Sequence, residues 1–150
     1  MLYIKNEPLM NTTDKVFAQL KRGTTVSLAS INSNGYPRPV PMAIVTIDKE
    51  KNIWFATSIK SDKVKAYKEN PRAGLSFHNN EMSASFTGKI TIVEEKKRKR
   101  EMWNEAISFY FPEGVDSHDY CLLKFAPELL RTVMIKDIYK YEVKTIVLLS

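Results

Sequence analysis

The spacing of apolar residues predicts one α-helix near the start of the chain, followed by a β-rich body. Three apolar side chains recur at helical spacing: Val16, Phe17 and Leu20. Thr12 or Thr13 could cap the start of this helix, and Gly23 would end it. The next segment, TTVSLASI at 24–31, is rich in β-formers and predicts a strand. The chain therefore enters a sheet directly after its first helix.

A hairpin with an unusual second strand follows. Asn34-Gly35 is typical of a tight hairpin turn, and Tyr36 begins the return strand. Prolines occupy alternate positions of that strand: Pro37, Pro39 and Pro41. Because proline has no backbone N–H, one edge of the strand loses every second donor and cannot pair continuously with another strand. The chain stays extended there, and a ligand could occupy the gap.

The rest of the pattern adds strands and two further helices. Strands are predicted over 53–57, 73–77, 83–94, 120–125 and 132–144. A short helix over 63–70 ends at Pro71, and a longer one is predicted over 94–110. About six strands joined mostly by tight turns, with helices at the periphery, predict a mainly β fold, a small antiparallel barrel. No glycine-rich loop follows a strand, which argues against a doubly wound parallel sheet.

Composition narrows the class of protein. The chain has 150 residues, 43% of them apolar and 27% charged, which suits one globular domain spanning 1–150. A chain of this length can bury a core without disulfides, and the lone Cys121 cannot form an internal one. No apolar run approaches the roughly 18 residues of a membrane helix, and MLYIKNEPLM lacks a signal-peptide pattern. We therefore expect a cytoplasmic protein with no membrane partner.

The charge balance favours an anionic partner. Lys and Arg number 23 against 17 Asp and Glu, which gives a net charge of +6. Five of these cations form the run Lys96–Arg100, flanked by glutamates at 94, 95 and 101. Mixed charge of this kind is typical of a solvated helix surface, with nucleic-acid binding as the alternative. Composition alone does not choose between nucleic acid and a phosphorylated small molecule.

Catalytic and metal motifs are weak. His78 and His118 lie in polar segments, and no second ligand accompanies either at metal-binding spacing, so no metal site is expected. Cys121 lies within the apolar strand YCLLKF, where an inert core thiol is expected rather than a nucleophile. No residue is therefore assigned as catalytic.

One group of residues has the pattern of an anion-binding site. Thr57 and Ser58 end a strand, Ser61 is placed to cap the next helix, and Lys63 stands in its first turn. Arg38, on the proline-interrupted strand, could reach the same anion with a bidentate fork. In the ordinary alternative, Ser61 only caps the helix and Lys63 points into water.

Several stretches together resemble a known family. The order is NGYPRPVPM at 34–42, then IWFATSIKSDKVKAYKENPRAGLSF at 53–77, then SASFTGKITIV at 83–93. It resembles the pyridoxamine phosphate oxidase-like split-barrel flavoproteins. The stretch MWNEAISFYFPEGVDSHDYCLLKFAPE, at 102–128, is similar to their general stress protein branch. The resemblance covers roughly residues 24–128, most of the chain.

The resemblance implies a six-stranded split barrel, a homodimer, and FMN bound between the subunits. In such proteins an Arg on the return strand reaches the FMN phosphate, and the backbone beyond it lines the isoalloxazine ring. A pair ending the next long strand and a pair beginning the following helix also contact the cofactor. With Ser61 added from the local pattern, the predicted contacts are Arg38, Pro39, Val40, Pro41, Met42, Ala56, Thr57, Ser61, Asp62, Lys63 and Ser83.

Three departures bear on activity. The oxidases have a Lys where this chain has Ala43, and an Arg-Lys pair where it has Asp62-Lys63. Their C-terminal Trp and Arg have no evident counterpart. The sequence therefore predicts an FMN-binding protein, a flavin-dependent oxidoreductase of another substrate rather than a pyridoxamine phosphate oxidase. The alternatives are haem (with His78 or His118 as ligand) or a deazaflavin in the same barrel, and a stress-associated nucleic-acid-binding module using Lys96–Arg100.

Overall fold

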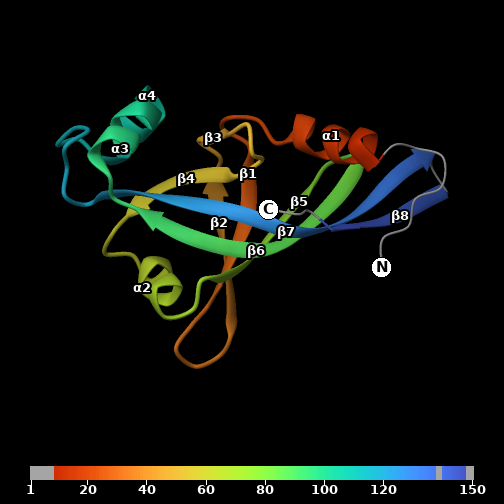
Figure 1. The fold of residues 1–150 in the computed structure, drawn as a ribbon, viewed down its shortest axis with the longest axis horizontal. Coiled ribbons are helices and arrows are strands. Elements are labelled where there is room, and N and C mark those ends of the chain that lie inside the picture. The colour runs from red at the N-terminus through yellow and green to blue at the C-terminus, as the bar shows by residue number, and fades with distance from the viewer. Residues whose placement is uncertain (1–8, 138–139, 148–150) are drawn as a thin grey trace.

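A curled antiparallel sheet carries most of the chain in the computed structural model, which describes residues 9–137 and 140–147 (Figure 1). The elements, in chain order, are α1 (Leu9–Gln19), β1 (Thr25–Ile31), β2 (Pro37–Ala43), β3 (Thr46–Ile47), β4 (Ile53–Ser58), α2 (Asp62–Glu69), β5 (Arg72–His78), β6 (Met82–Val93), α3 (Lys96–Met102), α4 (Glu105–Tyr110), β7 (Tyr120–Asp137) and β8 (Lys140–Val147). Every strand pairing is antiparallel, in the order β2-β1-β5-β6-β7-β4-β3, and β8 pairs with β7.

The predicted class of fold, a mainly β curled barrel with peripheral helices, is confirmed, but the strand count differs. The described sheet has eight strands rather than about six. The strand candidates 120–125 and 132–144 regroup: β7 runs unbroken from Tyr120 to Asp137, through Pro127. The first half of β7 pairs with β4 and its second half pairs with β8. One edge of this long strand is therefore shared by two neighbouring strands.

Pro127 is accommodated by an irregularity in the ladder. The pairing of β6 with β7 shifts register between Thr87 and Gly88. A Cβ on Gly88 would lie 2.2 Å from the carbonyl oxygen of Ala126, so only glycine lets the two backbones approach this closely. The register shift accommodates the missing N–H of Pro127, and β7 therefore continues through this residue without a break.

Two helix predictions need correction. The helix α1 begins at Leu9, so Thr12 and Thr13 lie inside it and are buried; the predicted cap at either residue is wrong. The helix predicted over 94–110 is two helices, α3 and α4. The break occurs because Asn104 is extended and its Oδ1 accepts a hydrogen bond from the N–H of Ile107 at 3.0 Å, which caps a new helix.

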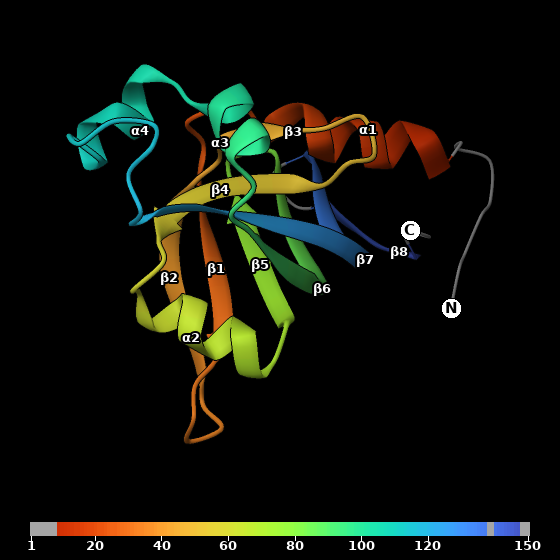
Figure 2. The same ribbon diagram turned by 60° about the vertical axis from the view of Figure 1, so that its left-hand side comes forward.

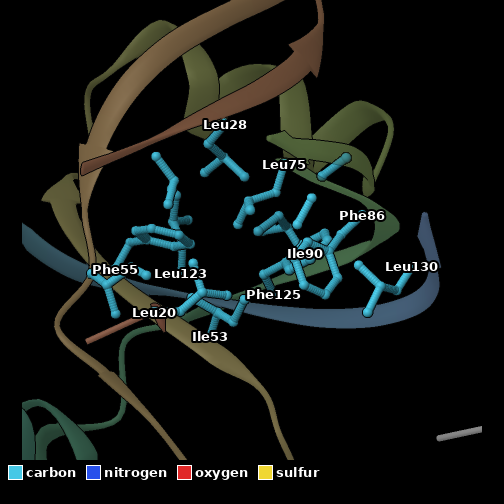
Figure 3. Packing of buried hydrophobic residues seen from close by; sticks show 14 of the residues in the cluster. Leu20, Leu28, Ile53, Phe55, Leu75, Phe86, Ile90, Leu123, Phe125 and Leu130 are labelled. Atoms are coloured by element: carbon cyan, nitrogen blue, oxygen red, sulfur yellow. The ribbon is translucent and has the colours of Figure 1, made fainter. Parts of the chain in front are cut away.

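Apolar side chains fill the inside of the curled sheet (Figure 3). Alternate residues of β6 are buried, as a strand with one face on a core requires. Phe55, Phe86 and Phe125 are fully buried, each worth about 1.5–3 kcal/mol over exposure. A second cluster lies on the opposite face of β4 and β7, where Trp54 and Tyr120 pack with residues of α4.

The edge strand β2 presents carbonyl groups outward and no N–H from its prolines. The N–H of Ile44 donates to the Thr24 carbonyl, and the N–H of Asn32 donates to the Tyr36 carbonyl, both at 2.9 Å, so even-numbered residues of this hairpin bond across to β1. Odd-numbered residues therefore face away from β1. Three of these are Pro37, Pro39 and Pro41. No helix among the described residues is long and apolar enough to cross a membrane.

Candidate functional site

Two cations from different elements interact electrostatically near the exposed edge of the sheet. Arg38 lies on β2, and Lys63 lies in the first turn of α2, which packs against β1 (Figure 2). Burial lowers the pKa of Lys63, and the charge of Arg38 lowers it further, while Cys121 and Asp62 act in the opposite direction. Neither cation forms a salt bridge with any residue that the structure describes. Two unpaired like charges held together in this way are typical of an anion site.

Ser61 adds a hydroxyl at the start of the same helix. It occupies the N-cap position with extended backbone, φ −66° and ψ 150°, but its side chain accepts no hydrogen bond from the helix. The predicted side-chain cap is therefore wrong. Its Oγ is instead buried and has no hydrogen-bond partner within the described chain. A buried hydroxyl left unpaired costs about 1–3 kcal/mol, and a turn of the side chain toward a bound anion would remove that cost.

A cleft of about 420 Å³ opens at the far end of β2. The ends of β2 and β4 form one side of it through Pro41, Met42, Ala56 and Thr57. The helix α4, which Figure 2 shows beside this end of β4, forms another side. Its size is that of a small-molecule site. Four of the predicted cofactor contacts are thus brought together on one surface.

The other predicted contacts lie outside this cleft. Arg38, Pro39 and Val40 continue along β2, the first two of them exposed. Asp62, beside Lys63, is exposed. Ser83 is exposed on β6, three positions from β2 in the strand order, and its carbonyl accepts a hydrogen bond from Thr132 Oγ1 at 2.9 Å. A single chain therefore does not bring Ser83 to the cleft.

Sequence reasoning missed the wall of the cleft opposite the strands. Ile107, Tyr110 and Phe111 line it from α4 and its C-cap. Asp119, whose Oδ1 accepts a hydrogen bond from Ser58 Oγ, lines it from the loop before β7. The one sequence feature that indicates a separate helix here is Asn104, a good N-cap residue in the middle of the predicted helix.

Cys121 is buried, as predicted, in the core cluster. Burial first, and then the charge of Glu94, raise the pKa of its thiol to about 11. A thiol that is protonated at neutral pH and shielded from solvent is a poor nucleophile. His78 and His118 are both exposed, and no group of three or more His, Cys, Asp or Glu residues in the described chain could hold a metal ion.

The basic run at 96–100 is only partly a solvated surface. Lys99 is buried: its Nζ donates to the Ser117 carbonyl at 3.4 Å and lies 5.1 Å from the centre of the Tyr120 ring. Arg98 pairs with Glu101, and Arg100 pairs with Asp116. Burial and pairing therefore engage three of the five cations, which weakens the case for a polyanion surface.

Structural comparison places the fold in a defined class. A Clostridium acetobutylicum protein related to general stress protein 26, of the pyridoxinephosphate oxidase family, matches with a TM-score of 0.75 at 23% identity, over 95% of this chain and 97% of that one. General stress protein 26 from Bacillus anthracis matches with a TM-score of 0.71 at 19% identity, over 82% and 94%. The fold is that of the split barrels.

The family itself follows from the sequence match. The model of the pyridoxamine 5'-phosphate oxidase-like family matches residues 11–130, so the chain belongs to that family. A third similar structure is a pyridoxamine 5'-phosphate oxidase-related, FMN-binding protein from Nostoc punctiforme, with a TM-score of 0.69 at 13% identity over 94% and 97%. No curated protein matches the chain significantly.

Proposed function

We propose that this protein is a cytoplasmic, homodimeric FMN-binding protein whose cofactor phosphate is held by Arg38 and Lys63. The observation that carries the proposal is the electrostatic interaction of these two cations, neither of which forms a salt bridge with a described residue. Two residues before Lys63, the buried Ser61 Oγ also has no hydrogen-bond partner among the described residues. A phosphate dianion offers three acceptor oxygens, and it would satisfy a guanidinium, an ammonium and a hydroxyl together. Family membership and the FMN-binding relative from Nostoc punctiforme support the identity of the ligand.

The residues along β2 fit the ring of the same cofactor. The outward edge of β2 offers carbonyl acceptors from its three prolines, Pro37, Pro39 and Pro41. The cleft that begins at Pro41 and Met42 offers apolar atoms to a flat ring. When bound, FMN supplies the redox chemistry, while the protein orients it and tunes its electronics. This is the basis for proposing a flavin-dependent oxidoreductase.

A second copy of the chain would complete the site. Arg38, Pro39 and Pro41 are exposed in the single chain, so a ring lying on β2 would have one face open to water. Ser83, which the family pattern assigns to the cofactor, is distant in the strand order. A homodimer with FMN at the subunit interface would cover the open face and could supply Ser83 from the partner. We propose this arrangement, and a mass measurement in solution tests it.

The substrate is proposed to differ from that of the oxidases. Ala43 stands where they have a Lys, so this strand lacks a cation that the oxidase pattern has. Among the described side chains that line the cleft, the ones with an acidic group are Tyr110 and Asp119. We assign neither as catalytic.

The test is flavin binding by the purified full-length protein. We expect a yellow protein, or one that quenches FMN fluorescence with saturation below about 50 µM, which corresponds to roughly 6 kcal/mol. A colourless protein that does not bind FMN at this concentration would overturn the cofactor assignment, and a Soret band with haem would favour the haem alternative. Retention on DNA with a steep salt dependence would favour the nucleic-acid alternative instead.

A further inference from the structure

The tight turn between α1 and β1 fixes the backbone of Arg22 against the end of β2. The N–H of Thr24 donates to the Lys21 carbonyl at 3.0 Å, which closes the turn around Arg22. Gly23 has a φ of 84°, a left-handed conformation that glycine adopts without strain. The N–H of Gly23 donates to the carbonyl of Ile44 at 2.8 Å, directly after β2. The turn and the end of the strand therefore hold each other in place.

The guanidinium of Arg22 is anchored at one nitrogen and free at the other two. Its Nε donates to the Val45 carbonyl at 3.2 Å. Its terminal nitrogens form neither a hydrogen bond nor a salt bridge with any residue that the structure describes. Arg22 and Ala43 both line the cleft, and Ala43 is the position at which the oxidases have a Lys. The cation that β2 lacks is thus present in the cleft, supplied by a neighbouring turn.

The charges of the cleft leave Arg22 without a partner. Among the described residues that line the cleft, Arg22 is the one cation and Asp119 is the one carboxylate. The carboxylate of Asp119 accepts a hydrogen bond from Ser58 Oγ, and it forms no salt bridge with Arg22. A charge at a partly dry surface acts more strongly than the same charge in water. The free guanidinium therefore suits a group that carries negative charge inside the cleft.

We propose that Arg22 stabilises the negative charge of the reduced flavin ring and so raises the potential of the bound FMN. Reduction by two electrons and one proton leaves the ring with one additional negative charge, and nearby protein charge tunes this equilibrium. The prolines of β2 offer only carbonyl acceptors on their outward edge, whereas the guanidinium of Arg22 donates. The inference rests on the proposed function, because it needs the flavin ring at β2 and the cleft. It adds the residue that sets the potential of that ring.

The role of Arg22 differs between the two states of the cofactor. The oxidised ring is neutral, so the guanidinium offers it a hydrogen bond without a full charge partner. The reduced ring carries a charge, and a hydrogen bond between two charged groups is about twice as strong as one between neutral groups. Loss of the cation should therefore weaken the binding of reduced FMN more than that of oxidised FMN. A tenfold difference between the two losses lowers the midpoint potential of a two-electron couple by about 30 mV.

The experiment measures the midpoint potential of FMN on the full-length protein and on two variants of Arg22. Dithionite is the reductant, and a dye of known potential is the reference. Arg22→Gln and Arg22→Lys both lose the Nε that donates to Val45, but only Arg22→Gln loses the charge. We expect Arg22→Gln to lower the potential by about 30 mV or more, a tenfold effect, and Arg22→Lys by less than about 10 mV, a twofold effect. Flavin fluorescence gives the affinity for oxidised FMN, which should fall by less than about threefold in both variants.

A neighbouring cation provides the matched control. Lys21 is exposed in the same turn and does not line the cleft. Lys21→Gln removes the same charge from the protein as Arg22→Gln does, and solvent and salt screen a charge that lies outside the cleft. We expect it to change the potential by less than about 10 mV, a twofold effect. Thermal unfolding without FMN shows that each variant is folded before its potential is compared.

The outcomes separate this inference from the cofactor assignment. If FMN binds and Arg22→Gln leaves the potential unchanged, the role of Arg22 is wrong and the cofactor assignment stands. Equal shifts in Arg22→Gln and Lys21→Gln would show a general effect of net charge, and equal shifts in Arg22→Gln and Arg22→Lys would show an effect of the turn; either result overturns the inference. If the wild-type protein does not bind FMN at about 50 µM, the proposed function fails, and the inference fails with it.

Discussion

Arg38 of β2 and Lys63 of α2 lie close enough that the charge of one lowers the pKa of the other. Neither is neutralised by a carboxylate in a salt bridge within the described residues. Holding two like charges together reduces the stability of the free protein, and an anion bound between them removes the repulsion. Two unpaired cations held close together are typical of a site where a ligand supplies the negative charge.

The hydroxyl of Ser61 should matter for FMN binding and not for stability. Ser61→Ala removes a buried oxygen that has no partner, so we expect an unchanged or higher Tm. FMN affinity should fall about 3–10-fold, the usual contribution of one hydrogen bond. Ser58→Ala is the control, because Ser58 Oγ donates to Asp119 and its loss should lower the Tm. A clear drop in the Tm of Ser61→Ala would show that the hydroxyl serves the helix instead.

The charge of Lys63 should make stability depend on pH. Its pKa is lowered in the folded protein from 10.5, so between the two pKa values the unfolded chain binds more protons and stability rises with pH. Lys63→Gln removes this dependence. We expect the variant to have the higher Tm at pH 7, and the difference to shrink as the pH approaches 10. Thermal unfolding at several pH values measures it, and a constant difference would contradict the lowered pKa of Lys63.

The close approach of β6 and β7 should depend on Gly88. In Gly88→Ala the new Cβ would lie 2.2 Å from the Ala126 carbonyl oxygen, and backbone must move to relieve the clash. We expect a loss of about 2–3 kcal/mol in the free energy of unfolding, measured by urea denaturation. Gly74→Ala on β5 is the control, because its nearest atoms are 3.9 Å away. Equal effects of the two substitutions would argue against the close contact.

Cys121 should be unreactive until the protein unfolds. Its thiol is fully buried, and its pKa is raised to about 11, chiefly by burial. We expect no modification by iodoacetamide at pH 7.5 in native protein and complete modification in denaturant, followed by mass spectrometry. Rapid labelling of the native protein would place the thiol at the surface and contradict the packing of β7 in the core.

The backbone preferences of neighbouring residues predict much of the fold and part of the site. The hairpin at Asn34-Gly35, the alternating prolines of β2 and the helix starting near Lys63 each follow from backbone preferences of a few neighbouring residues. Arg38 is predicted to bind the same anion as Lys63 from its place on the return strand, and in the structure its charge lowers the pKa of Lys63.

The errors come from contacts between distant residues. Ser61 has the sequence of a helix cap, but its side chain forms no capping hydrogen bond and its Oγ is buried. Lys99 lies in a charged run, yet packing against Tyr120, 21 residues further along, buries it. The α4 wall of the cleft was not foreseen, because helix periodicity cannot say which side of a barrel the helix will face.

The most direct test of the account compares FMN with riboflavin, which lacks only the phosphate. Affinities are measured by flavin fluorescence for the wild-type protein and for Arg38→Ala, with Lys65→Ala, an exposed cation on α2, as the control. We expect the wild-type protein and Lys65→Ala to bind FMN at least about tenfold more tightly than they bind riboflavin. Arg38→Ala should lose about 1.5–3 kcal/mol of FMN affinity and bind the two flavins almost equally. Equal affinity of the wild-type protein for FMN and riboflavin would contradict it.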